Sequence, residues 1–283
     1  MYKIVKKEIL AKDIKLIGVE APHITYNAKA GNFVVVIVDE KGERVPLTIY
    51  DWDKERGIVY IIFMEVGTST KKLGLLNEGD YLYAIAGPFG KHFNIQNYGN
   101  VVIIGGGVGT PAIFPIARDL KKSGNKVLSI MGFRTKELVI LEKEMKSVSD
   151  KVIIATNDGS YGKKGLVTDA LQELIYEKEK IDLVIAIGPV IMMKAVSDLT
   201  KIYNLKTIVS LNAIMIDATG MCGGCRVTVG GEIKFSCVDG PDFDGHLVDF
   251  DQLLLRLSAY KDKEQESLTY CRLNKKIEEN KNV

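Results

Sequence analysis

The chain has 283 residues, of which 46% are hydrophobic and 26% are charged, a composition that excludes an intrinsically disordered protein. Its 38 Lys and Arg residues nearly balance its 36 Asp and Glu residues, and a net charge of +2 argues against nucleic acid or an anionic membrane as the partner. The N-terminus carries lysines instead of the apolar core of a signal peptide, and we find no apolar run of about 18 residues. We therefore expect a cytoplasmic protein with two domains and a small appendage.

Residues 1–99 have the pattern of a domain of short strands. Segments 31–40, 44–52, 57–66 and 80–90 are rich in Val, Ile, Tyr and Phe, and Gly, Asp, Asn or Pro residues bound each of them. Short strands between turn residues, with little helix, are typical of an antiparallel β-barrel. We predict such a barrel here.

Residues 100–213 have a different pattern, in which apolar runs alternate with helical segments. One apolar run ends in glycines at 105–109 and leads into a helical stretch at 111–124, and a second apolar run follows at 126–133. Strand, helix and strand in this order form a βαβ unit, and the pattern repeats along the domain. We predict a doubly wound parallel sheet, with Thr110 as the N-terminal cap of its first helix.

Residues 214–283 contain all the cysteines of the chain. Three of them fall within sixteen residues and the fourth stands alone near the end: Cys222, Cys225, Cys237 and Cys271. The Gly-Gly pair at 230–231 predicts a hairpin that returns Cys237 to the loop of Cys222 and Cys225. Clustered cysteines in a cytosolic chain indicate metal ligands before a disulfide. The chain after residue 249 is expected to be helical.

The glycine run at 105–109 lies where a predicted strand enters a helix. Glycine lets backbone amides approach a phosphate closely, and the helix N-terminus adds partial positive charge. Two further polar segments, 156–160 and 188–189, follow later strands of the same predicted sheet. Ligands of open α/β sheets bind at the carboxyl ends of the strands, so these three segments together predict a dinucleotide site.

Two segments of the predicted barrel offer groups that suit a second nucleotide cofactor. Residues 44–49 supply an arginine and a hydroxyl, and residues 67–70 supply a glycine and three hydroxyls. A cation, hydroxyls and exposed amides are the groups that hold a pyrophosphate and the edge of a flavin. Each segment alone is weak evidence for a cofactor site. The order of the two predicted domains, with the barrel first and the nucleotide domain second, is what favours it.

Seven motifs along the chain resemble the ferredoxin-NADP reductase superfamily. They are RVPLTI at 44–49, VGTSTKKL at 66–73, GPFG at 87–90, GGGVGTP at 105–111, GFRTKE at 132–137, TNDGSYGKKG at 156–165 and IGP at 187–189. The chain is most similar to the branch with a C-terminal iron-sulfur segment. That branch includes the electron-transfer subunit of dihydroorotate dehydrogenase and the small subunit of NADH-dependent reduced ferredoxin:NADP oxidoreductase, also described as a sulfide dehydrogenase subunit.

The resemblance implies a role for each part of the chain. Residues 1–99 would bind FAD, residues 100–213 would bind NAD(H), and residues 214–283 would form an iron-sulfur segment with a helical tail. The residues implied to contact FAD are Arg44, Pro46, Leu47, Thr48, Gly67 and Thr70. Those implied for the nicotinamide nucleotide are Gly106, Gly107, Asp158 and Gly188. The common flavin motif has its arginine three residues before the hydroxyl residue, whereas Arg44 precedes Thr48 by four.

The cysteine segment carries the most specific motif. The dihydroorotate dehydrogenase subunit resembles C-x4-C-x2-C-x11-C, and this chain has Asp217 at the first position, followed by Cys222, Cys225 and Cys237. By resemblance to the small subunit of the NADPH- and ferredoxin-linked enzyme, these four residues would hold a 2Fe-2S cluster. Aspartate is compatible with that role because its carboxylate carries the same single negative charge as a thiolate.

Two other ligand sets stay open for this segment. The three clustered cysteines with His246 would make a structural zinc site of the Cys3His type. Alternatively, Cys271 would fold back as the fourth ligand of the cluster. Iron analysis and the visible spectrum distinguish zinc from iron.

Together the parts predict an electron-transfer flavoprotein subunit. Electrons would pass between NAD(H), FAD and 2Fe-2S, and then to a larger flavin and iron-sulfur subunit that completes a heterodimer or a higher assembly and reaches ferredoxin. The preferred enzyme is a flavin-bifurcating NADH/ferredoxin:NADP oxidoreductase. The alternatives are the dihydroorotate dehydrogenase subunit and, in another class, a zinc-stabilised binding module with a vestigial nucleotide site. The resemblance favours NAD(H), although Arg134 and Lys136 offer charges for a 2′-phosphate.

Overall fold

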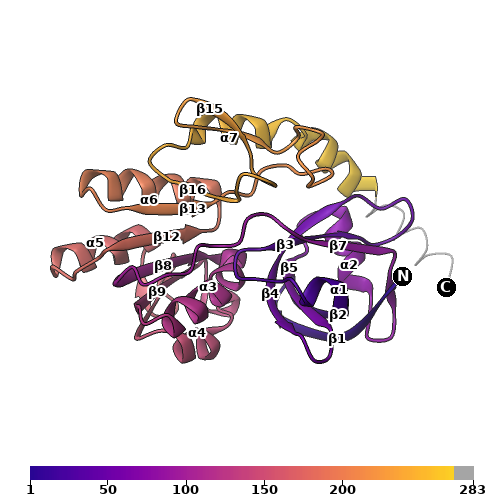
Figure 1. The fold of residues 1–283 in the computed structure, drawn as a ribbon, viewed down its shortest axis with the longest axis horizontal. Coiled ribbons are helices and arrows are strands. Elements are labelled where there is room, and N and C mark those ends of the chain that lie inside the picture. The colour runs from indigo at the N-terminus through magenta and orange to yellow at the C-terminus, as the bar shows by residue number, and fades with distance from the viewer. Residues whose placement is uncertain (271–283) are drawn as a thin grey trace.

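The computed structural model describes residues 1–270 of the chain. It has three parts in chain order: an antiparallel barrel, a parallel-rich sheet with helices, and a C-terminal segment with a hairpin (Figure 1). The predicted fold class is confirmed. Within the described residues, no helix has the length and apolarity needed to cross a membrane.

The barrel has seven antiparallel strands in the order β6-β1-β2-β5-β4-β3-β7. The two strands at the ends of this order are separated by one residue of the chain, so the sheet nearly closes. Alternate side chains of each strand point inward, and Ile17, Ile61 and Phe63 are fully buried there. Its elements are β1 (Tyr2–Ala11), β2 (Ile14–Glu20), α1 (Pro22–Thr25), β3 (Phe33–Ile37), β4 (Val45–Asp53), β5 (Ile58–Met64), α2 (Thr68–Leu75), β6 (Tyr81–Leu82) and β7 (Ala84–Phe89).

The second sheet has the order β11-β10-β9-β8-β12-β13-β16, where β16 is Asp242–Asp244, and all its pairs are parallel except the last. The chain winds outward in both directions from β8, which makes the boundary between β8 and β12 the switch point of the sheet. Its elements are β8 (Asn100–Gly106), η1 (Gly107–Gly109), α3 (Thr110–Lys122), β9 (Lys126–Phe133), η2 (Lys136–Leu138), α4 (Glu142–Val148), β10 (Lys151–Thr156), β11 (Lys163–Lys164), α5 (Val167–Tyr176), β12 (Leu183–Ile187), α6 (Val190–Ile202) and β13 (Thr207–Ser210).

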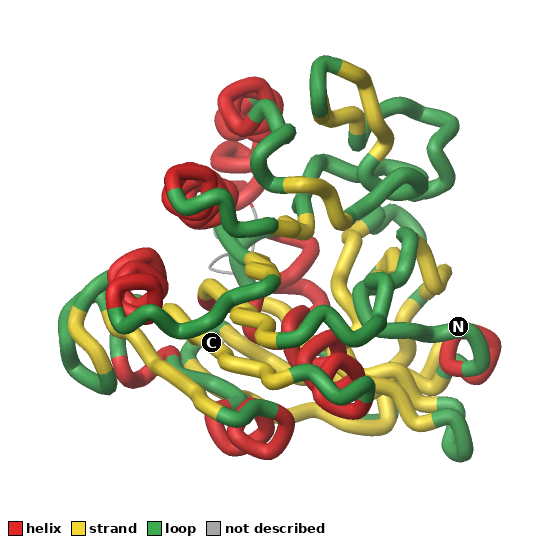
Figure 2. Tube along the Cα trace, turned by 60° about the vertical axis from the view of Figure 1, so that its left-hand side comes forward, coloured by secondary structure: helices red, strands yellow, loops and turns green. Residues whose placement is uncertain are grey.

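Helices cover both faces of this sheet (Figure 2). On one face Ile103 of β8 packs in the same cluster as α3 and α4. On the other face the next residue, Ile104, packs with α5 and α6. Successive side chains of a strand point to opposite faces, so both faces of β8 are apolar and both need a cover. The predicted doubly wound arrangement follows from that pattern.

The start of α3 differs from the prediction. Thr110 is the first residue of the helix and Gly109 is its cap, because the glycine run itself turns as the 3₁₀ helix η1 before the α-helix begins. The hydroxyl of Thr110 is buried and has no hydrogen-bond partner within residues 1–270. The prediction of Thr110 as the cap is therefore wrong.

The C-terminal segment contains the predicted hairpin, which follows the loop of Cys222 and Cys225. Gly230 and Gly231 form its turn with φ angles of 60° and 81°, as a two-residue hairpin turn of type I′ requires. The segment then returns to the second sheet, where its last strand lies antiparallel to β13. Helix follows, and residues 261–270 are helical too and extend toward the barrel (Figure 1). The elements are β14 (Arg226–Val229), β15 (Glu232–Phe235), β16 (Asp242–Asp244) and α7 (Phe250–Ser258).

The barrel and the second sheet share one apolar core. Tyr50 of β4 lies 5.1 Å from Phe114 of α3 between ring centroids. Beside them, Arg118 Nη1 donates to Asp51 Oδ1 at 2.6 Å, and its guanidinium lies 5.0 Å from the Trp52 ring centroid. These contacts attach the helix that follows the glycine run to the strand that carries the predicted flavin segment.

The C-terminal segment is attached to both of the other parts. The Lys91 amide, which follows the barrel, donates to the Gly240 carbonyl at 2.6 Å. The Leu211 amide, which follows β13, donates to the Pro241 carbonyl at 2.9 Å. The three parts therefore meet at the stretch between the hairpin and β16.

Candidate functional site

The structure brings the two predicted flavin segments together. Arg44 is exposed directly before β4, and Pro46 and Thr48 pair with Val35 and Phe33 of β3. Glu43, the residue before Arg44, links the two segments, because Ser69 Oγ of α2 donates to Glu43 Oε2 at 2.6 Å. Residues 44–48 and 67–70 are far apart in the sequence and therefore come together only in the fold.

The N-terminus of α2 has open space at Gly67, while the Thr68 hydroxyl lies 3.0 Å from that of Ser267. Gly67 is its cap, and the Gly67 amide donates to Thr70 Oγ1 at 3.0 Å. A Cβ atom at Gly67 would meet nothing within 4 Å. The first amides of a helix have no partner within the helix and bind anions well. The arrangement fits a pyrophosphate such as that of FAD.

The predicted nucleotide glycines meet at the switch point of the second sheet. A Cβ at Gly188 would lie 3.1 Å from Gly106 Cα, and a Cβ at Gly106 would lie 2.4 Å from Met192 Sδ. Gly107 has φ +53° with open space where a side chain would point. The loop therefore approaches its neighbours closely at Gly106 and has open space at Gly107. These features suit a nicotinamide nucleotide.

Asp158 follows β10, further along the same edge of the sheet. Its Oδ1 accepts hydrogen bonds from the amide and the hydroxyl of Ser160 at 3.0 and 2.7 Å, which hold the pKa of Asp158 below its usual range. The Asp158 amide donates to the Arg134 carbonyl, and the Lys136 amide donates to Ser160 Oγ. Asp158 is therefore an ionised group beside the Arg134 loop, separated from Gly106 by the width of β9.

The cysteine segment brings a carboxylate and three thiols onto one loop and one hairpin. Cys225 and Cys237 are buried with their sulfurs 3.1 Å apart, as the hairpin predicts, whereas Cys222 is exposed. Burial, with the hydrogen bond to Cys225, raises the pKa of Cys237 to about 12. Metal binding must therefore displace a firmly held proton from this thiol.

Asp217 faces the same loop. Its two oxygens accept from the amides of Thr219 and Cys222 at 2.9 and 3.0 Å. These hydrogen bonds, led by that of Thr219, hold the pKa of Asp217 below its usual range. Asp217 is thus a carboxylate at neutral pH, and the donor set of three sulfurs and one carboxylate fits a 2Fe-2S cluster in its chemistry.

The alternative zinc ligand His246 is engaged elsewhere. Its Nε2 lies 2.9 Å from the hydroxyl of Thr200 on α6, and the Thr207 hydroxyl extends that chain of hydrogen bonds. This contact argues against His246 as the fourth ligand of a Cys3His site. Cys271, the other alternative, lies outside the described residues.

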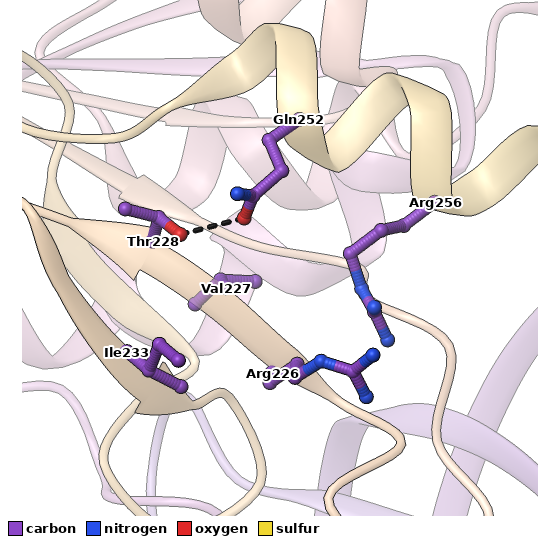
Figure 3. Close-up of a pocket in the computed structure, with 6 residues that line it drawn as sticks. All are labelled: Arg226, Val227, Thr228, Ile233, Gln252 and Arg256. Atoms are coloured by element: carbon purple, nitrogen blue, oxygen red, sulfur yellow. Dashed lines mark hydrogen bonds between the residues drawn. The ribbon is translucent and has the colours of Figure 1, made fainter.

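Two arginines beside the cysteine loop were not among the predicted site residues. Arg226 and Arg256 line a cavity of about 280 Å³ between the hairpin and α7, with Thr228 and Gln252 (Figure 3). Both guanidinium groups donate to carbonyls of the cysteine loop. No sequence motif marks Arg256, because it reaches the loop from a helix 32 residues away.

The comparisons with known proteins locate one family segment. Residues 212–249 match the iron-sulfur cluster binding domain of dihydroorotate dehydrogenase B. The matched range contains all four predicted cluster ligands: Asp217, Cys222, Cys225 and Cys237.

Other relatives match most of the chain. A Thermotoga maritima homolog of the dihydroorotate dehydrogenase B (NAD(+)) electron transfer subunit is 46% identical over 97% of this chain and 96% of its own length. The probable dihydroorotate dehydrogenase B (NAD(+)) electron transfer subunit of Pyrococcus furiosus is 37% identical over 76% of this chain and 79% of its own. A chain in the structure of NADH-dependent reduced ferredoxin-NADP oxidoreductase, reported for flavin-based electron bifurcation, is 44% identical with a TM-score of 0.91. The similarity covers 95% of this chain and 97% of that one.

Proposed function

Because the chain belongs to the family of dihydroorotate dehydrogenase B electron-transfer subunits and their homologues, we propose that it passes electrons between NAD(H), FAD and a 2Fe-2S cluster. The electrons would go to or come from a larger flavin and iron-sulfur subunit. In the proposed division, residues 1–99 bind FAD, 100–213 bind NAD(H), and 214–283 hold the cluster and the helical tail.

One observation carries this proposal. The loop with Asp217 and the cysteines leaves the second sheet after β13, at the same carboxyl edge that holds Gly106 and Gly188. At this edge η1 also contacts strand β5 of the barrel. A nucleotide, a flavin and a cluster bound at the three predicted sites would therefore lie near one another, as electron transfer requires.

FAD, when bound, supplies the change from two-electron hydride chemistry to single-electron transfer. The chain's own residues orient the reactants. The amides at the start of α2 hold an anionic pyrophosphate, and the glycines at the switch point let a nucleotide approach the backbone closely. Tyr50, Phe114 and the Arg118–Asp51 ion pair hold α3 against β4 and so fix the distance between the two cofactor sites.

The preferred enzyme is a flavin-bifurcating NADH/ferredoxin:NADP oxidoreductase, with ferredoxin reached through the larger subunit. One observation supports it over dihydroorotate dehydrogenase: an aspartate, Asp217, and not a cysteine, stands at the first ligand position. Isolation of the native complex and identification of the partner by mass spectrometry test this choice. A dihydroorotate dehydrogenase catalytic subunit in the complex would reverse it.

We expect the purified chain to be yellow-brown and to contain FAD and about two irons. The reason is that the open space at Gly67 and the donor set around Cys225 fit these two groups. Visible absorption, flavin extraction and iron analysis measure both. A colourless protein with one zinc per chain would overturn the proposed function in favour of the binding module.

We also expect NADH to be preferred over NADPH. The local charges of Arg134 and Lys136 mildly favour a 2′-phosphate, but Lys136 Nζ lies 5.6 Å from the Tyr161 ring centroid, where a cation-π contact already engages it. Steady-state diaphorase assays compare kcat/KM for the two nucleotides. A value about tenfold higher for NADPH would reverse this expectation.

A further inference from the structure

The two glycines between Cys222 and Cys225 each have their carbonyl held by an arginine. Arg226 Nη1 donates to the Gly223 carbonyl at 3.2 Å, and Arg256 Nη2 donates to the Gly224 carbonyl at 3.0 Å. Both arginines line the cavity of Figure 3, and none of the cysteines within residues 1–270 does. The arginines therefore hold the loop from the side of this cavity.

Arg256 has this position because α7 is attached to the hairpin. Thr228 Oγ1 donates to Gln252 Oε1 at 2.6 Å, one turn before Arg256 on the helix (Figure 3). At the start of α7 the Asp249 amide donates to the Thr228 carbonyl at 2.9 Å, and its carboxylate caps the helix. The side chain of Arg256 is thus directed to the loop by a rigid element.

The carbonyl contacts also orient the amides of the loop. A trans peptide is planar, with its C=O and N–H pointing in opposite directions. With the Gly223 carbonyl on Arg226, the Gly224 amide lies on the opposite side, where it is 3.4 Å from Cys222 Sγ. In the same way, the contact of Arg256 with the Gly224 carbonyl directs the Cys225 amide away from the cavity.

Hydrogen bonds to cysteine sulfurs and the net charge of the surroundings set the reduction potential of an iron-sulfur cluster. Three thiolates and one carboxylate give the proposed ligand set four negative charges, and reduction adds another. The Arg256 guanidinium contacts the carbonyl of Gly224, the residue directly before the proposed ligand Cys225. A positive charge at this place stabilises the reduced form more than the oxidised form, because the reduced form is more negative.

We propose that Arg256 is a positioning residue of the cluster loop, which holds the Gly224 carbonyl so that the Cys225 amide points away from the cavity and which raises the reduction potential of the cluster. This inference rests on the proposed function. Arg226 has a smaller part, because its own backbone amide also donates to the Gly223 carbonyl at 3.4 Å.

An EPR-monitored redox titration of the full-length purified chain tests the proposal. We expect Arg256→Gln to shift the midpoint potential of the cluster to a more negative value, and Arg226→Gln to shift it less. Arg256→Lys keeps the charge but loses the planar fork that reaches the carbonyl, so its potential should lie between those of Arg256→Gln and the wild type. If Arg256→Gln holds no iron, the shift is read from Arg256→Lys.

Lys234→Gln is the matched control, since it removes one positive charge from β15 where the ammonium bonds Glu232 at 2.6 Å. Its potential should stay close to that of the wild type. A wild-type potential in both Arg256 variants would overturn the proposal, and an equal shift in Lys234→Gln would overturn the positioning role. A wild-type chain that binds no iron would instead overturn the proposed function, and this inference with it.

Discussion

Replacing Asp217 by alanine is expected to make the cluster labile, so that most of the iron is lost during gel filtration. The carboxylate is ionised and lies on the loop that must wrap the cluster, with Oδ2 3.0 Å from the Cys222 amide. Without it, one iron would have an open coordination position exposed to water. Iron content per chain and the visible spectrum before and after filtration measure the loss.

Three further variants separate ligation from loop structure. Asp217→Asn retains one oxygen, which can accept from only one of the two amides that bond to the Asp217 carboxylate, and it lacks the charge, so it should also lose iron. Asp217→Cys should retain the cluster with an altered EPR signal. Cys271→Ser should leave the spectrum intact. If Cys271→Ser loses the cluster while Asp217→Ala keeps it, Asp217 is not the fourth ligand.

Changing Gly109 to alanine is expected to lower NADH-dependent reduction of the flavin by about 100-fold. A Cβ at this position would lie 2.1 Å from the Ile187 carbonyl oxygen and 2.8 Å from Gly188 Cα. Both are backbone atoms, so relief requires the end of β12 to move. That movement displaces Gly188 from Gly106 and misplaces the nucleotide. The value of kcat/KM for NADH with ferricyanide as acceptor measures the effect.

Gly18→Ala in β2 is the control for general destabilisation. Its Cβ would meet the Tyr60 side chain at 3.0 Å, which gives way more easily than backbone, and it lies outside the second sheet. We expect its kcat/KM to stay near the wild-type value. Both variants should retain their visible spectra and far-UV circular dichroism. Normal NADH reduction by Gly109→Ala would show that the contact of Gly109 with β12 does not position the nucleotide.

The sequence by itself determined the order of the parts and the type of each. Short runs rich in Val, Ile, Tyr and Phe between turn residues predicted the barrel, and apolar runs separated by helical segments predicted the doubly wound sheet. Both signals are local, because the face that a strand or a helix buries depends on the apolar residues within that element. The hairpin at Gly230 and Gly231 was predictable for the same reason, since its turn requires positive φ, and with it came the contact between Cys225 and Cys237.

Only the tertiary structure decided which distant groups meet. The start of α3 depended on how the glycine run packs on β12, so the cap role predicted for Thr110 was wrong. The contact of Ser69 with Glu43 and that of Arg256 with Gly224 join segments that no spacing relates. Likewise, β16 completes the second sheet although it follows the cysteine segment in the chain. The pattern of apolar residues predicts which face of each element is buried, whereas the partner of a polar side chain depends on how the elements pack.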